Sequence, residues 1–217
     1  MAGNEARRAE LWRPLFAAAG VLLAVGGSMH PEADDALEFK EQLVVMMSNS
    51  SWVPGHSLMA LSSMVLVAGL LLARRDSAWA AAGRLLPLAV VAAAVNSVEL
   101  VLHTASVVDK DQLAAGGMPP VAFAHLALAV VAYPLFGLTM AALAWRMAAS
   151  WAVPLRAVSA AAVLGGVANA VAAPATILLR EPAFSVLFTG AVALALWMVV
   201  MGVAGLRQPS AVRVAMA

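Results

Sequence analysis

The feature that most constrains this chain is a series of six apolar stretches separated by short polar segments. A helix that crosses the hydrocarbon core of a bilayer needs about 20 consecutive apolar residues. Hydrophobic residues make up 63% of the chain and charged residues only 12%, whereas a soluble domain is about 45–50% apolar. The composition therefore predicts an integral membrane protein. The expected spans are residues 14–29, 54–72, 85–108, 120–144, 157–179 and 182–206.

The distribution of basic residues predicts how these spans are oriented. We expect an all-α membrane protein of one domain, residues 1–217, whose six transmembrane helices form an up-and-down bundle. Cytoplasmic loops are enriched in Lys and Arg, and one orientation places ten of the thirteen Lys and Arg residues inside. We therefore expect a multi-pass plasma-membrane protein with both termini in the cytoplasm. The inner residues are Arg7, Arg8, Arg13, Arg74, Arg75, Arg84, Arg146, Arg156, Arg207 and Arg213, and the outer ones are Lys40, Lys110 and Arg180.

The first stretch also fits a second interpretation. It has a basic N-terminal flank, an apolar run and small residues near Ala24–Gly26, a pattern typical of a cleaved signal peptide. The inner placement of Arg74, Arg75 and Arg84 does not depend on this choice, because it follows from the spans on either side of them.

The segment between the first two spans predicts an amphipathic helix over residues 32–48, lying on the outer face. Pro31 suits the first turn of a helix, and the acidic residues after it suit the positive end of the helix dipole. Apolar residues then recur at helical spacing from Leu37 to Met47. We expect Trp52, at the end of this segment, to lie at the membrane interface.

The third span contains a carboxylate and an imidazole inside its apolar sequence. A helix turns by about 100° per residue, so Asn96, Glu99 and His103 fall within an arc of about 60°. A charged side chain at the centre of a membrane helix costs about 2.5–3.5 kcal/mol on insertion scales. Glu99 therefore needs a partner, a proton or a metal ion.

The four histidines of the chain all fall toward the outer side in this topology. His56 begins the second span, His103 is near the outer end of the third, and His125 lies in the first turns of the fourth. His30 precedes Pro31, which disfavours helical geometry, so we expect it at the lip of the membrane in a supporting role. We expect the polar side chains that support the site by hydrogen bonds to be Asn96, Asn169, Ser63 and His30.

The residue types favour a metal or haem site near the outer face. Glu99 and His103 are four residues apart, so both can reach one ion from one helical turn, and facing helices of a bundle can add His56 and His125 as ligands. These ligands suit zinc, copper or iron. Two of the histidines could instead hold a b-type haem. The chain has no cysteine, which excludes thiolate ligands. We favour a redox or electron-transfer role, as an oxidoreductase if the protein is an enzyme.

Three alternatives remain open. Glu99 and His103 could couple protons to transport in a small permease, or could act as acid and base on a lipid-soluble substrate such as an isoprenoid or a quinone. The chain could also be an accessory subunit of a larger membrane complex or a homo-oligomer, with its sixth span as the contact. A net charge of +1 gives no basic surface for nucleic acid.

Overall fold

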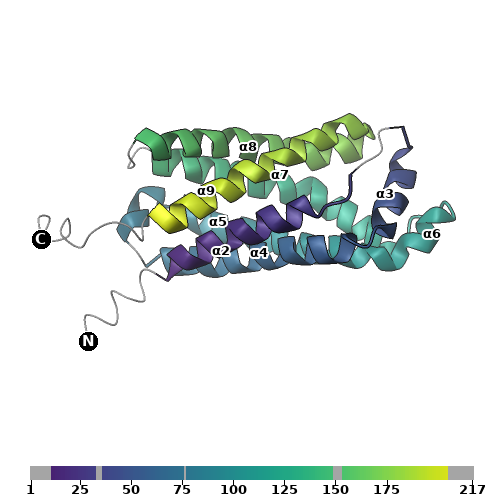
Figure 1. Cartoon of the computed structure of the whole chain (residues 1–217), viewed down its shortest axis with the longest axis horizontal. Helices are drawn as coiled ribbons and strands as arrows, with labels where there is room; N and C mark the ends of the chain where they lie inside the picture. Colours follow the sequence, from purple (N-terminus) through teal and green to yellow (C-terminus); the bar gives the residue numbers. More distant parts are fainter. Residues whose placement is uncertain (1–10, 33–35, 76, 149–152, 205–217) are drawn as a thin grey trace, which may run out of the picture.

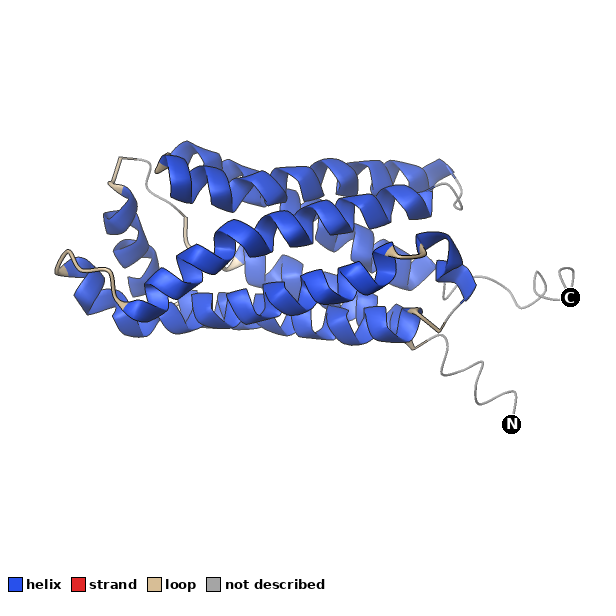
Figure 2. Ribbon diagram, turned by 180° about the vertical axis from the view of Figure 1, so that it is seen from behind, coloured by secondary structure: helices blue, strands red, loops and turns tan. Residues whose placement is uncertain are grey.

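The computed structural model describes residues 11–32, 36–75, 77–148 and 153–204, and these residues form helices and loops without a strand (Figure 2). Five helical segments are long and apolar enough to cross a membrane, which supports an all-α multi-pass protein. The N-terminal stretch forms an apolar helix of 17 residues, so a sixth span stays a prediction. The long helices are α2 (Trp12–Ser28), α4 (Trp52–Ala73), α5 (Leu85–Ala105), α7 (Pro120–Ala148), α8 (Val153–Leu179) and α9 (Gly190–Ala204).

The six long helices form a ring in which each helix packs against its neighbours in the sequence. Consecutive helices run in opposite directions (Figure 1), and α2 also packs against α9, which closes the ring. Four of the basic residues that predict the orientation lie outside the described residues; they are Arg7, Arg8, Arg207 and Arg213. This order places the end of α2, the start of α4, the end of α5 and the start of α7 at one end of the bundle.

Glycines allow the helices to approach closely at several crossings. A Cβ atom on Gly26 would lie 2.7 Å from the carbonyl oxygen of Gly55, so the end of α2 touches the start of α4. Gly137 and Gly166 make a similar backbone contact between α7 and α8. Small residues at such crossings let membrane helices gain van der Waals contact and bring their side chains to common positions.

The predicted helix over residues 32–48 is present only in part. α3 spans Phe39–Ser48, and Pro31 and Glu32 are not helical, whereas Asp34 and Asp35 lie outside the described residues. The helix begins at Phe39 because Glu38 is its N-cap and forms a capping box with Glu41, whose Oε2 accepts the Glu38 N–H at 3.3 Å. The capping pair, rather than the proline, therefore sets the start of α3.

Other boundaries also differ from the apolar pattern: α7 extends to Ala148 rather than residue 144, and α8 begins at Val153 rather than residue 157. α5 ends at Ala105 rather than residue 108 and is followed by a 3₁₀ turn, η2 (Ser106–Asp109), and a short helix, α6 (Lys110–Ala114). The last apolar stretch begins as a 3₁₀ helix, η3 (Pro182–Thr189), before α9. A further 3₁₀ helix, η1 (Ser77–Ala82), precedes α5.

A small apolar cluster covers the end of the bundle where α3 and α6 lie (Figure 1). Trp52 belongs to this cluster and its side chain is 0% exposed, so it packs inside the protein, and its predicted depth at the membrane interface stays a prediction. The apolar residues of α3 and α6 pack over the indole because this shields it from water. We call this cluster the cap; its buried members are Leu43, Met47, Trp52, Leu113, Ala122 and Leu126.

Candidate metal centre

The four histidines lie side by side beneath the cap. The ring centroids of His30 and His56 are 4.8 Å apart, those of His56 and His103 are 4.2 Å apart, and those of His103 and His125 are 4.0 Å apart. We call this arrangement the histidine row. It includes His30, which the sequence placed at the lip of the membrane, because the contact between Gly26 and Gly55 brings the end of α2 against α4.

Hydrogen bonds fix the orientation of three of the four rings. Nδ1 of His56 lies 2.7 Å from the Trp52 carbonyl oxygen, and Nδ1 of His30 lies 2.8 Å from the Pro31 carbonyl oxygen. A carbonyl oxygen only accepts, so Nδ1 must be the protonated nitrogen in both rings. Nδ1 of His125 lies 2.7 Å from Glu99 Oε1 and donates to it when the carboxylate is ionised. A ring that is protonated only at Nδ1 carries a free lone pair on Nε2.

This is the arrangement that metal-binding histidines commonly have. A ligating imidazole usually donates its second ring N–H to a carboxylate or a backbone carbonyl, which fixes its tautomer and strengthens it as a ligand. His125 has the carboxylate form of this partner in Glu99, and His56 has the carbonyl form in Trp52. The structure thus gives Glu99 a bond to a neighbouring helix that its position in α5 did not predict.

Several buried polar atoms around the row have no hydrogen-bond partner among the described residues. They are His56 Nε2, His103 Nδ1, Glu99 Oε2 and Trp52 Nε1. His103 Nδ1 lies 3.7 Å from Glu99 Oε1, which is too far for a hydrogen bond. A buried polar atom without a partner costs about 1–3 kcal/mol. Three of the four atoms, all except the indole N–H, are of a type that can bind a metal ion.

The ligand atoms form two overlapping groups of three. One group is His30, His56 and His103, and the other is Glu99, His103 and His125; within each group the ligand atoms lie within 4.8 Å of one another. Imidazole nitrogens bound to a tetrahedral ion at about 2.0–2.1 Å lie about 3.3 Å apart. Some separations within the groups can exceed this spacing by up to about 1.5 Å, so the side chains would have to draw closer around a bound ion.

The row does not fit a haem group held between two histidines. Axial imidazoles face each other across the iron and the macrocycle, whereas neighbouring rings here pack directly against one another at 4.0–4.8 Å between centroids. A third ring, His103, fills the space between His56 and His125. The haem prediction therefore finds no support in this arrangement.

Partial burial favours the neutral form of the His30 ring. His30 lies at the solvent side of the row, and its ring packs against the rings of His56 and Trp52. Desolvation lowers the pKa of His30 from its usual value, and the hydrogen bond to Pro31 partly offsets this effect. Neutral imidazole is the form that binds metal ions.

The predicted supporting residues take different positions. Asn96 Nδ2 donates to Ser63 Oγ at 3.2 Å, and Ser63 Oγ donates to the Ala93 carbonyl oxygen at 2.9 Å. These bonds hold α4 against α5 and do not touch the imidazoles. Asn169 is buried on α8, and no hydrogen bond in the described part of the chain joins it to the row.

Two residues that position the row were missed by sequence reasoning. Asp109 is buried, and its Oδ2 accepts the backbone N–H of Ala122 at 2.8 Å. This bond caps the first turn of α7 from the end of η2 and so sets the height of His125 relative to His103. Trp52 has its ring centroid 4.2 Å from that of His56. The spacing of Trp52 and His56, four residues apart, could have indicated this contact, but the Asp109 bond spans 13 residues and leaves no local pattern.

No protein-family model, no curated protein and no solved structure matches this chain, so its function has to be argued from the geometry of the histidine row.

Proposed function

We propose that this chain is a multi-pass membrane protein that binds a transition-metal ion at the histidine row. The observation that best supports the proposal is the set of Nδ1 hydrogen bonds of His30, His56 and His125. These bonds direct protonation to Nδ1 and leave Nε2 as a ligand, as in known metal sites. His103 lies between the other rings and is common to both ligand groups, so we propose it as the central ligand.

The ligand types select a group of metals. Imidazole suits zinc, copper and iron, and the absence of cysteine from the chain excludes thiolate donors. Glu99 supplies one negative charge in a buried site, where an uncompensated charge is costly. A monovalent copper ion would leave the site neutral, whereas a divalent ion would leave one positive charge. We therefore favour copper and a redox or electron-transfer role.

The decisive experiment is the metal content of the full chain purified in detergent, measured by mass spectrometry. We expect about one ion per chain, lost in a Glu99→Ala, His103→Ala double variant. The matched control is Ser97→Ala, because Ser97 is buried on the same helix and bonds only to the Ala93 carbonyl oxygen. The control should keep its metal.

X-ray absorption spectroscopy tests the site without a mutation that could affect folding. We expect nitrogen and oxygen neighbours at about 2.0–2.1 Å from the bound ion if it is zinc, with the multiple scattering of imidazole. A wild-type protein that binds no zinc, copper or iron when each is supplied would contradict the proposal.

A proton-handling role is the second candidate, and a specific contact favours it. Glu99 and His125 form a buried pair at 2.7 Å, and the other three imidazoles continue from this pair in direct ring contact. Such a series of protonatable groups marks proton paths in transporters. A metal-free wild-type protein whose proton uptake in liposomes is abolished by Glu99→Gln would select this role.

A further inference from the structure

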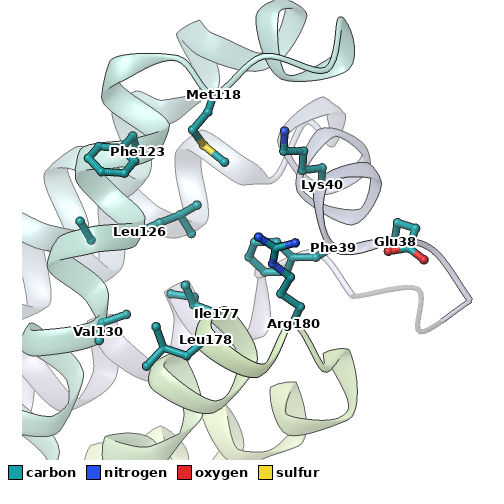
Figure 3. A pocket seen from close by; sticks show the side chains of 11 residues that line it. Glu38, Phe39, Lys40, Met118, Phe123, Leu126, Val130, Ile177, Leu178 and Arg180 are labelled. Carbon is teal, nitrogen blue, oxygen red and sulfur yellow. The ribbon is translucent and has the colours of Figure 1, made fainter.

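A groove opens beside the cap, away from the histidine row. It has a volume of about 480 Å³ and lies between the start of α3, the start of α7 and the end of α8 (Figure 3). Leu126, Val130, Ile177 and Leu178 line its wall with apolar side chains. Phe123 and Leu178 at its edge are 61% and 66% exposed. The groove is thus open sideways, toward the surroundings of the bundle.

A second, apolar groove continues this one along α7 and α8. It has a volume of about 430 Å³, is lined by Pro134, Ala170 and Pro174 among others, and shares Leu178 with the first groove. On α8 the two grooves together extend from Ala170 to Arg180, which at 1.5 Å per residue is about 15 Å. This is half of the roughly 30 Å hydrocarbon core of a bilayer, and so the depth of one leaflet.

Two basic side chains and one carboxylate, Lys40, Arg180 and Glu38, line the mouth of the groove. The described residues at this end of the bundle include three basic side chains, Lys40, Lys110 and Arg180, and two of them line the groove. Figure 3 shows the Arg180 side chain reaching from the end of α8 toward Phe39. Lys40 Nζ donates to the carbonyl oxygens of Gly116 and Gly117 at 3.0 and 3.3 Å, and an ammonium group has a third N–H to donate.

Among the described residues, the carboxylates beside this mouth take part in helix caps. Glu38 forms the capping box at the start of α3 with Glu41, and Glu181 Oε1 accepts the Ala183 N–H at 3.4 Å. Arg180 itself has a φ of 54° directly after α8, a position at which glycine is usual because its backbone conformation disfavours side chains. The conformation of the turn therefore gives no reason for an arginine at this position.

We propose that this groove binds an anionic phospholipid, with an acyl chain along α7 and α8 and the phosphate at Arg180 and Lys40. A guanidinium group binds phosphate through two parallel hydrogen bonds, and the apolar wall gains free energy by covering a hydrocarbon chain. The length of the groove matches one leaflet, which a soluble phosphate compound would not require. The inference is independent of the metal site.

The test compares two lipids with the same acyl chains on the delipidated full chain in detergent micelles. Phosphatidylglycerol is anionic and phosphatidylcholine is zwitterionic; binding is followed by native mass spectrometry and by the thermal unfolding midpoint. We expect wild-type protein to prefer phosphatidylglycerol by about tenfold or more, the effect of one charge-assisted contact. Equal binding of both lipids would overturn the proposal.

Matched variants locate the binding. Arg180→Gln and Arg180→Gly should both abolish the preference, and the glycine variant fits the positive φ, so its loss of preference does not reflect misfolding. Arg74→Gln removes the same charge from an exposed position at the other end of α4 and should leave the preference unchanged. Ala127→Trp fills the groove and should weaken binding of both lipids. An equal effect of the Arg74 and Arg180 variants, or unchanged binding to Ala127→Trp, would also overturn the proposal.

Discussion

Replacing Gly26 by alanine should separate the end of α2 from α4 and so disturb the histidine row. The new Cβ atom would lie 2.7 Å from the Gly55 carbonyl oxygen, 2.9 Å from Met59 Cγ and 3.0 Å from Leu58 Cβ. Because favourable contacts begin at about 3.5 Å, the helix end has to retreat by about 0.8 Å from a backbone atom that cannot rotate away.

Gly27→Ala is the matched control for this prediction. A Cβ atom on Gly27 meets nothing within 4 Å, and both residues lie in the last turn of α2. The gain in helix propensity from Gly to Ala is therefore common to both variants and cancels in the comparison. What remains is the overpacking at Gly26, which costs about 1–3 kcal/mol.

The assay is thermal unfolding of both variants in the same detergent. A protein of this size loses about 2–4 °C per kcal/mol, so Gly26→Ala should unfold about 2–12 °C below Gly27→Ala. The metal affinity of Gly26→Ala should also fall, because His30 moves away from His56. Equal unfolding midpoints for the two variants would refute the close approach of α2 and α4.

Three further variants test individual contacts. Glu99→Gln leaves the Nδ1 of His125 without a charged acceptor, and because such carboxylate partners tune ligand basicity, metal affinity measured by competition with a chelator should fall about 10–100-fold; unchanged affinity would argue against this role. Asp109→Ala removes the cap of α7 and should lower stability by about 1 kcal/mol, with faster hydrogen exchange in the first turn of α7 as the readout and Asp109→Asn as the control that keeps an acceptor. Ser63→Ala removes the acceptor of Asn96 and should lower stability by about 1–3 kcal/mol in thermal unfolding; no change would mean that Asn96 finds another partner.

The sequence predicted most of the helical framework because the signals are local. Apolar length identified the segments that became α4, α5, α7, α8 and the η3–α9 segment. Local sequence was less useful where two local signals compete. Pro31 and the acidic residues after it favoured an early helix start, but the capping pair of Glu38 and Glu41 sets the start at Phe39.

In the candidate site, too, the sequence predicted the local pattern but not the contacts between helices. The spacing of Asn96, Glu99 and His103 predicted one polar face on α5, and the structure buries Asn96 and Glu99 on it. The same spacing could not predict that these residues contact different helices. Asn96 bonds to Ser63 on α4. Glu99 bonds to His125 on α7. Each partner depends on which helix packs beside α5 at that height. The spacing of polar residues within α5 carries no information about this.

The sequence by itself determined the class of protein, the apolar helices and the polar face of α5, since these depend on residues within a few turns of one another. Tertiary structure decided that His30 joins the row, that Trp52 is buried beneath α3 and α6, and that Asp109 caps α7 across 13 residues. The physical reason is that these contacts join separate helices. Their positions follow from backbone approach at glycines such as Gly26 and from the closed order of the ring, neither of which has a local pattern.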